Sequence, residues 1–125
     1  MIFGIGMDLV HIDRIAELHA RFGSRFENRI FTERERSYCL TQPCPPLHLA
    51  ARFAAKEAFF KALGTGKLPT LRWSEVSVER SEAGRPTIRV SGSLTTLMAQ
   101  LDIKTVHVTM THTKGTAAAV VVLEH

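Results

Sequence analysis

The 125-residue sequence predicts a single α+β domain spanning residues 1–125. Three observations carry this prediction. Residues 49–63 are rich in alanine, lack glycine and proline, and are followed by Gly64, so they predict a long helix that ends at this glycine. Alternating or continuous apolar residues near both ends of the chain predict strands. Helical segments follow the first strand, and two hairpins follow the long helix, which is an order typical of α+β proteins.

Residues 1–12 are predicted to form the first strand, because apolar residues alternate there with glycines and Asp8. Glycine weakens a strand and often marks the close approach of another backbone or a ligand. Asp8 shares one face with Gly4 and Gly6. A carboxylate on that open face could hold a hard cation. The alternative is a strand-end aspartate that accepts hydrogen bonds from backbone amides.

Three short helices are predicted between the first strand and the long helix. Asp13 is expected to cap a helix over residues 14–22, and a second short helix follows the Gly-Ser pair after it. Thr32 and Glu35 have the spacing of a capping box, so a third helix is expected to run to about Leu40. A proline-rich connection then leads into the long helix.

The second half of the chain is predicted to contain two hairpins separated by a short helix. The apolar run at residues 116–123 is nearly continuous, so this strand is expected to be central and buried on both faces. The expected elements are a strand over 72–80, its partner over 87–90, a helix capped by Ser91 or Ser93, a strand over 105–111, and the central strand over 116–123.

The composition is that of an ordinary soluble globular protein, with 45% hydrophobic residues, and it excludes a disordered chain. No stretch approaches the roughly 20 apolar residues of a membrane span. The N-terminus lacks a basic region and places Asp8 within its apolar run, so it is a poor signal peptide and a cytoplasmic location is expected. The net charge of +4 favours an acidic partner, such as nucleic acid, a phosphorylated ligand or an acidic protein.

The two cysteines are too few for a disulfide framework. Cys44 and His48 have one plausible zinc spacing, but together with Cys39 they lack a fourth ligand. The sequence therefore disfavours a zinc site.

Charge on the long helix is confined to Arg52, Lys56, Glu57 and Lys61, which lie along borders between apolar faces. One interpretation is structural. Glu57 and Lys61 form an i,i+4 pair worth about 0.2–0.5 kcal/mol on a surface, and the other two stems can reach water over apolar neighbours. The alternative is that a mostly buried helix carries these charges as part of a functional site.

Arginines are concentrated in the first third of the chain, among apolar residues. Two interpretations remain open on pattern alone: ordinary amphipathic helices with solvated faces, or a basic docking surface for an acidic partner. The arginines are Arg14, Arg21, Arg25, Arg29, Arg34 and Arg36.

Four motifs follow one another along the chain: GIGMDLVHIDRI at 4–15, RFAAKEAFFKALGTG at 52–66, GRP at 84–86 and THTKGTAAAVVVLE at 111–124. Together they resemble the holo-acyl-carrier-protein synthases, the small bacterial type of 4′-phosphopantetheinyl transferase. The resemblance runs essentially from end to end. It implies the fold of that family, an antiparallel sheet packed against a long central helix and shorter helices.

The resemblance also implies a reaction and a metal. The family transfers 4′-phosphopantetheine from coenzyme A to a serine hydroxyl of apo acyl carrier protein and releases adenosine 3′,5′-bisphosphate. The positions that match the family's magnesium ligands are Asp8 and Glu57. Lys61 is implied to act at the phosphates, so Glu57 and Lys61 are the expected catalytic residues. Glu57 itself, or a water that it orients, is the candidate general base.

The coenzyme A contacts implied by the resemblance come from the same motifs. The phosphates are assigned to Arg52, Lys56, Lys61 and His112. The adenine side is assigned to the loops Gly64, Thr65, Gly66 and Gly84, Arg85, Pro86. Some positions differ from the common family pattern, namely His11, Thr111, Thr113 and Thr116, and these changes leave both expected metal ligands in place.

The resemblance implies two kinds of protein partner. In the family, the early basic helix docks an acidic helix of the carrier protein, and the enzyme is a homotrimer with active sites at subunit boundaries. The residues that match the docking region are Arg14, Leu18, Arg21, Phe22, Arg25 and Phe26.

Two other functions fit parts of the sequence. A nucleic-acid-binding module would use the basic first third, but few aromatic residues are interleaved with the arginines. A catalytically inactive relative would serve as a scaffold, but Asp8, Glu57 and Lys61 are all retained.

Overall fold

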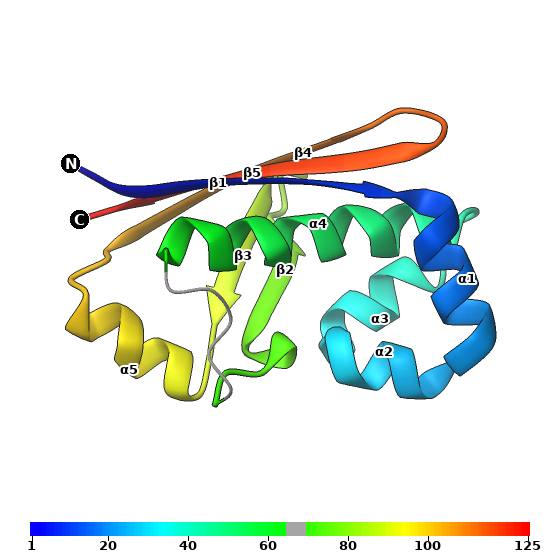
Figure 1. Cartoon of the computed structure of the whole chain (residues 1–125), viewed down its shortest axis with the longest axis horizontal. Helices are drawn as coiled ribbons and strands as arrows, with labels where there is room; N and C mark the ends of the chain where they lie inside the picture. The colour runs from blue at the N-terminus through cyan, green and yellow to red at the C-terminus, as the bar shows by residue number, and fades with distance from the viewer. Residues whose placement is uncertain (65–69) are drawn as a thin grey trace.

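Helix α4 packs along one face of a three-stranded antiparallel sheet, as Figure 1 shows. The computed structural model describes residues 1–64 and 70–125. The strand order is β1-β5-β4, so the C-terminal strand is central as predicted. The sheet consists of β1 (Ile2–His11), β4 (Thr105–His112) and β5 (Thr116–Glu124), and the helix on it is α4 (Pro45–Leu63). The α+β class predicted from the sequence is confirmed.

Shorter elements, which we call the lower layer, cover the side of α4 that faces away from this sheet (Figure 1). The β2–β3 hairpin forms a separate two-stranded antiparallel sheet, as the sequence predicted. The remaining elements are α1 (Ile12–Phe22), α2 (Ser24–Ile30), α3 (Glu33–Cys39), the 3-10 helix η1 (Trp73–Glu75), β2 (Val76–Arg80), β3 (Pro86–Val90) and α5 (Ser93–Gln100).

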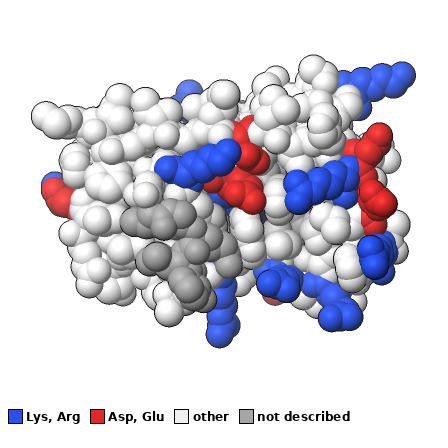
Figure 2. All heavy atoms as spheres, viewed as in Figure 1, with Lys and Arg blue, Asp and Glu red and all other residues white. Residues whose placement is uncertain are grey.

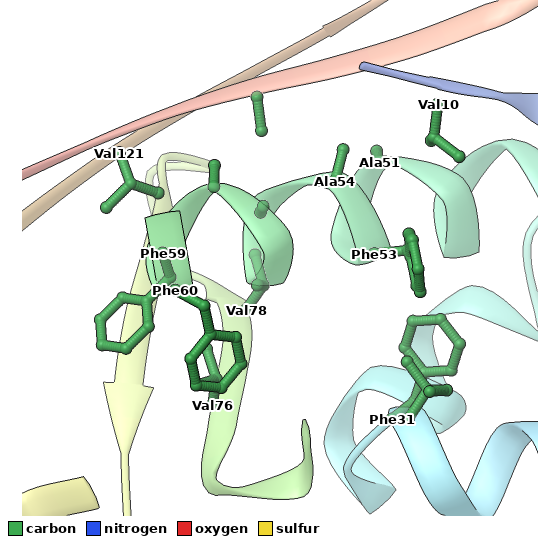
Figure 3. Close-up of a cluster of buried hydrophobic side chains, with 14 of the residues drawn as sticks. Val10, Phe31, Ala51, Phe53, Ala54, Phe59, Phe60, Val76, Val78 and Val121 are labelled. Carbon is green, nitrogen blue, oxygen red and sulfur yellow. The ribbon is translucent and has the colours of Figure 1, made fainter. Parts of the chain in front are cut away.

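Helix α4 is buried on most sides because the three-stranded sheet packs on one side of it and the lower layer packs on the other. Small side chains such as Ala51 and Ala54 face the sheet, whereas Phe53, Phe59 and Phe60 point into the lower layer (Figure 3). Apolar residues around the whole helix therefore reflect its central position in the core. Across the described residues, no helix is both long and apolar enough to cross a membrane.

Strand β1 lies directly on the backbone of α4 because it has glycine where other strands have side chains. A Cβ atom added to Gly4 would lie 2.0 Å from the carbonyl oxygen of Ala62, and one added to Gly6 would lie 1.9 Å from that of Ala58. Such distances are far below van der Waals contact, so only glycine fits at either position. The prediction that these glycines mark the close approach of another backbone is confirmed.

The helix starts show where local sequence patterns succeed and fail. The predicted capping box is present, since the Thr32 hydroxyl accepts from the Glu35 amide and the Glu35 carboxylate accepts from the Thr32 amide. Asp13 does not cap α1, which begins one residue before it, at Ile12. Asp13 lies instead in the first turn, where a negative charge still favours the helix dipole.

The start of α5 is stabilised by a residue distant in sequence. Neither Ser91 nor Ser93 caps this helix, because its N-cap is Gly92. The Glu75 carboxylate instead accepts hydrogen bonds from the Ser93 amide at 2.7 Å and from the Ser93 hydroxyl at 2.8 Å. Glu75 belongs to η1, and this 3-10 turn is also the reason that the strand predicted from residue 72 begins only at Val76.

The outer face of the three-stranded sheet corrects one expectation. In β5, alternate residues such as Ala119 and Val121 are buried against α4, but Val120 and Val122 on the other face are only partly covered. No described element lies over this outer face (Figure 1). The strand is therefore central but not buried on both faces within one chain.

A buried ion pair joins α4 to the lower layer. The Lys56 ammonium lies 2.6 Å from a carboxylate oxygen of Glu35, and neither side chain is exposed to solvent. The ammonium also donates to the backbone carbonyls of Ile30 and Trp73, at 2.6 and 3.2 Å. Glu35 accepts in addition from the Val78 amide. Burial lowers the pKa of Lys56, and the Glu35 charge acts in the opposite direction.

We predict that Lys56→Met lowers the free energy of unfolding by about 3–5 kcal/mol, because it leaves the Glu35 carboxylate buried without its cation. Urea denaturation at neutral pH measures this loss. Lys61→Met is the matched control, since this lysine lies on the same helix but is exposed, and it should lower the free energy of unfolding far less than Lys56→Met does. The double variant Glu35→Gln/Lys56→Met removes both charges and should be more stable than Lys56→Met alone. Equal losses for Lys56→Met and Lys61→Met would contradict the assignment.

Candidate active site

The first cluster of charged side chains forms where β1 crosses α4. The Lys61 ammonium lies 2.9 Å from a carboxylate oxygen of Asp8 and donates to the Met7 carbonyl at 3.2 Å. The Lys61 side chain is 55% exposed, whereas Asp8 is largely covered. The hydrogen bond and charge of Asp8, followed by the charge of Glu57, raise the pKa of Lys61. The structure therefore brings together the three residues that the sequence singled out, which we call the acidic cluster: Asp8, Glu57 and Lys61.

The acidic cluster has the chemistry of a site for a hard cation. The ammonium of Lys61 already lies against two oxygen atoms of β1, one from a carboxylate and one from a carbonyl. Oxygen is the ligand type that Mg²⁺ prefers, and Mg²⁺ commonly uses only one or two protein carboxylates together with phosphate oxygens and water. Among the described residues, no group of three or more His, Cys, Asp and Glu side chains could hold a metal ion by itself. These oxygen ligands therefore fit a magnesium ion that is shared with a phosphorylated substrate.

The second cluster consists of basic side chains around a small cavity of about 190 Å³ beside β4. We call it the basic cavity: its basic residues are His48 and Arg52 of α4, Arg80 of β2 and His112 of β4. None of the described residues that line it is acidic. Burial, followed by the charges of Arg52, Arg80 and His112, lowers the pKa of His48. Two guanidinium groups and two imidazoles thus gather with no carboxylate among the described lining residues, which favours binding of an anion.

Arg52 is the most deeply buried member of the basic cavity, with 1% of its surface exposed. Its Nη1 donates only a long bond of 3.4 Å to the His48 carbonyl, and its Nε has no hydrogen-bond partner among the described residues. A buried guanidinium with unfilled donors is costly unless a ligand fills them. This geometry agrees with the sequence-based expectation that Arg52 contacts a phosphate.

The structure does not support Lys56 as a phosphate ligand. Its ammonium is fully buried and is occupied by Glu35 and two backbone carbonyls, so no donor reaches solvent. Sequence could not separate Lys56 from Arg52, because the two residues lie one turn apart on the same helix.

The other predicted contacts are distributed as follows. Pro86 lines the basic cavity beside His112, and Arg85 is exposed in the turn just before it. Gly64 ends α4 in the left-handed conformation, with φ of 79°. Thr65 and Gly66 lie outside the described residues.

Sequence reasoning missed two members of the basic cavity, His48 and Arg80. His48 was detectable in principle, since it lies four residues before Arg52 on α4. Arg80 had no local signal, because its place in the cavity depends on how β2 packs beside α4.

The two clusters lie at opposite edges of the main sheet. Asp8 belongs to β1 and His112 belongs to β4, and these are the two outer strands of the order β1-β5-β4. On α4, Arg52 and Glu57 point about 140° apart around the helix axis. One chain therefore presents its acidic cluster and its basic cavity on different sides.

A third feature lies on α1 and α2, at the end of the molecule where basic side chains gather in Figure 2. Arg25, Arg29 and Phe22 line a hollow of about 250 Å³ with the largely buried Phe26 at its base. The Arg21 guanidinium lies 5.2 Å from the centre of the Phe22 ring. Three residues of the expected docking set, Phe22, Arg25 and Phe26, thus line this hollow, and Arg21 lies against the ring of Phe22. Arg14 and Leu18 precede them on α1.

Comparison with known proteins gives consistent matches over nearly the whole chain. Residues 4–121 match the sequence pattern of the 4′-phosphopantetheinyl transferase superfamily. A holo-[acyl-carrier-protein] synthase of Chlamydia muridarum is 43% identical over 122 residues, covering 98% of this chain and 94% of that protein.

Two crystal structures extend this comparison to the fold. The holo-[acyl-carrier-protein] synthase of Neisseria meningitidis superimposes with a TM-score of 0.93 at 35% identity, and all of both chains is covered. The Helicobacter pylori synthase, solved in complex with coenzyme A, has a TM-score of 0.85 at 31% identity, with 96% of this chain and 99% of that chain covered.

Proposed function

This chain belongs to the holo-[acyl-carrier-protein] synthases of the 4′-phosphopantetheinyl transferase superfamily, and we propose that its two charged clusters divide the work of that reaction. It is a transferase that moves the 4′-phosphopantetheine group from coenzyme A to acyl carrier protein. The acidic cluster acts at the pyrophosphate of coenzyme A, and the basic cavity binds a phosphate at the nucleotide end. The observation that carries this proposal is the contact of Lys61 with Asp8 across β1 and α4, with Glu57 near the same ammonium.

The acidic cluster holds the reacting phosphate. Asp8 and Glu57 would bind Mg²⁺, which supplies positive charge to the pyrophosphate when it is bound. Lys61 is exposed and flexible enough to turn its ammonium from Asp8 toward a phosphate oxygen. Its positive charge then stabilises the negative charge that grows on the leaving adenosine 3′,5′-bisphosphate. Glu57 is the candidate to accept the proton of the carrier serine, directly or through a water that it orients.

The basic cavity holds the 3′-phosphate of coenzyme A. The buried Arg52 has an unfilled Nε donor among the described residues, and His112 and Arg80 converge on the same space. A dianion there would neutralise charges that now repel one another. Pro86 lines this cavity and Arg85 precedes it in the chain, which supports assigning both residues to the adenine side of the nucleotide.

We predict that Asp8→Asn and Glu57→Gln each lower kcat/KM for carrier-protein modification about 100-fold or more, because each removes charge from the reacting phosphate site. Mass spectrometry of apo carrier protein incubated with coenzyme A and Mg²⁺ measures the gain of the phosphopantetheine group. Calorimetric titration with Mg²⁺ in the presence of adenosine 3′,5′-bisphosphate should show the corresponding loss of metal binding.

Asp102→Asn is the matched control, because this carboxylate is exposed and, within residues 1–64 and 70–125, forms an ion pair with the exposed Lys104 alone. Full activity with unchanged metal binding in both cluster variants would remove the metal assignment. Failure of the unaltered protein to modify any carrier protein would remove the proposed function.

A complete site needs more than one copy of the chain, because the two clusters lie at opposite edges of the sheet. The outer face of the sheet offers a surface for a second copy, since it exposes the apolar side chains of Ile5, Met7 and Leu9. An exposed patch of this kind marks an interface more often than a free surface. We propose a homotrimer in which the acidic cluster of one subunit meets the basic cavity of the next.

Leu9→Glu should convert the trimer to a monomer and lower transfer activity by at least about 10-fold, because it buries a charge in the apolar interface. Light scattering coupled to gel filtration measures the mass. Leu40→Glu is the matched control, since Leu40 is an exposed leucine at the end of α3 on another surface. It should keep both mass and activity. A fully active monomeric protein would contradict this assembly.

The hollow on α1 and α2 that is lined by Phe22, Arg25 and Arg29 is proposed to dock the carrier protein. Arg14, Arg21 and Arg25 are exposed and would meet acidic residues, while Phe22 and the rim of Phe26 would take an apolar side chain. Charges at the rim of an interface mainly raise the association rate and its sensitivity to salt.

The double variant Arg21→Ala/Arg25→Ala should raise KM for carrier protein about 10-fold at low salt and flatten its dependence on ionic strength. KM for coenzyme A should stay unchanged, because neither arginine lies in the acidic cluster or the basic cavity. Lys104→Ala removes an exposed positive charge elsewhere and serves as the control. Equal effects of the two variants would indicate a general effect of net charge, and docking at this hollow would then be rejected.

A further inference from the structure

Tyr38 of α3 contacts two guanidinium groups at once. The Cζ atom of Arg52 lies 4.5 Å from the centre of the Tyr38 ring, and that of Arg80 lies 5.5 Å from it. Both distances are within the range of cation–π attraction. The ring of His48 meets Tyr38 edge-on at 5.7 Å. One aromatic side chain therefore touches three of the four basic members of the basic cavity.

Neither guanidinium has a carboxylate partner among the described residues. Arg52 is buried with an unfilled Nε, and the hydrogen bond of Arg80 goes to the Gly84 carbonyl at 2.9 Å. Two like charges held near one another repel. The negative face of an aromatic ring offsets part of that repulsion. Tyr38 thus allows both cations to stay in place before any anion binds.

The distribution of acidic residues indicates where the anion binds. Arg52 and Arg80 also line a second, larger cavity of about 730 Å³ on the α3 side, which includes Glu33 and Glu79. The described lining of the basic cavity contains no acidic residue and includes two histidines. An anion is therefore favoured in the basic cavity and disfavoured next to the two glutamates.

We propose that Tyr38 is a positioning residue that holds Arg52 and Arg80 as a preorganised pair, and that this pair selects coenzyme A bearing a 3′-phosphate over 3′-dephospho-coenzyme A. This inference rests on the proposed function, because it assigns the nucleotide end of coenzyme A to the basic cavity. A ring is required at position 38, and a phenolic hydroxyl is not, because the attraction comes from the face of the ring.

The test compares KM and kcat for coenzyme A and for 3′-dephospho-coenzyme A, with the same carrier protein. Tyr38→Leu should raise KM for coenzyme A about 10-fold, which corresponds to about 1.4 kcal/mol. It should leave kcat and the KM for 3′-dephospho-coenzyme A within about twofold of the unaltered protein. Tyr38→Phe should retain the preference for the 3′-phosphate, because it keeps the ring.

Two further variants separate positioning from a structural effect. Arg34→Ala removes an exposed cation on the same helix that pairs with Glu79, and it should change neither KM. Arg80→Met alters an exposed position, so the fold should be retained, and it should lose the same preference as Tyr38→Leu. This second variant decides the question if Tyr38→Leu does not fold.

The inference is overturned if Tyr38→Leu and Arg80→Met keep the preference for coenzyme A over 3′-dephospho-coenzyme A. It is also overturned if these variants change KM, or kcat, by the same factor for both substrates. It is also overturned if Tyr38→Phe behaves like Tyr38→Leu. An unaltered protein that transfers phosphopantetheine equally well from both substrates would remove the 3′-phosphate assignment while leaving the transferase function intact. An unaltered protein that transfers from neither would remove the proposed function itself.

Discussion

The contact of β1 with the backbone of α4 is the constraint on which the rest of the structure depends. Gly4 and Gly6 leave no room for a side chain between strand and helix, where a Cβ atom would come within 2.0 Å of a helix carbonyl. This close approach puts Asp8, on the same face of β1, within hydrogen-bond distance of Lys61. The glycines thus act on the chemistry of the site although they supply no functional group to it.

The charges of α4 take different roles because different layers pack on its sides. Lys56 faces the lower layer, where Glu35 and backbone carbonyls satisfy it completely, and it stabilises the fold. Arg52 is as deeply buried, but it meets Tyr38 and other basic groups instead of a carboxylate. A buried cation with a partner is structural, whereas one without a partner is available to a ligand.

The separation of the two clusters connects the site to the uncovered sheet face. One chain presents the acidic cluster at the β1 edge and the basic cavity at the β4 edge. The apolar outer face lies between these edges, so packing of further copies on it would bring clusters of different subunits toward each other. The composition of the two clusters and the exposed apolar face both support the proposal of a site shared between subunits.

The sequence by itself determined the long helix, the capping box at Thr32, the glycine-rich strand and the family, because each depends on local patterns or on motifs with fixed spacing. It also singled out Asp8, Glu57 and Lys61. Only the tertiary structure decided which of Lys56 and Arg52 is free to bind a ligand. It also placed Arg80 in the basic cavity and Glu75 at the start of α5. These outcomes depend on contacts between residues far apart in the chain, and no local pattern encodes them.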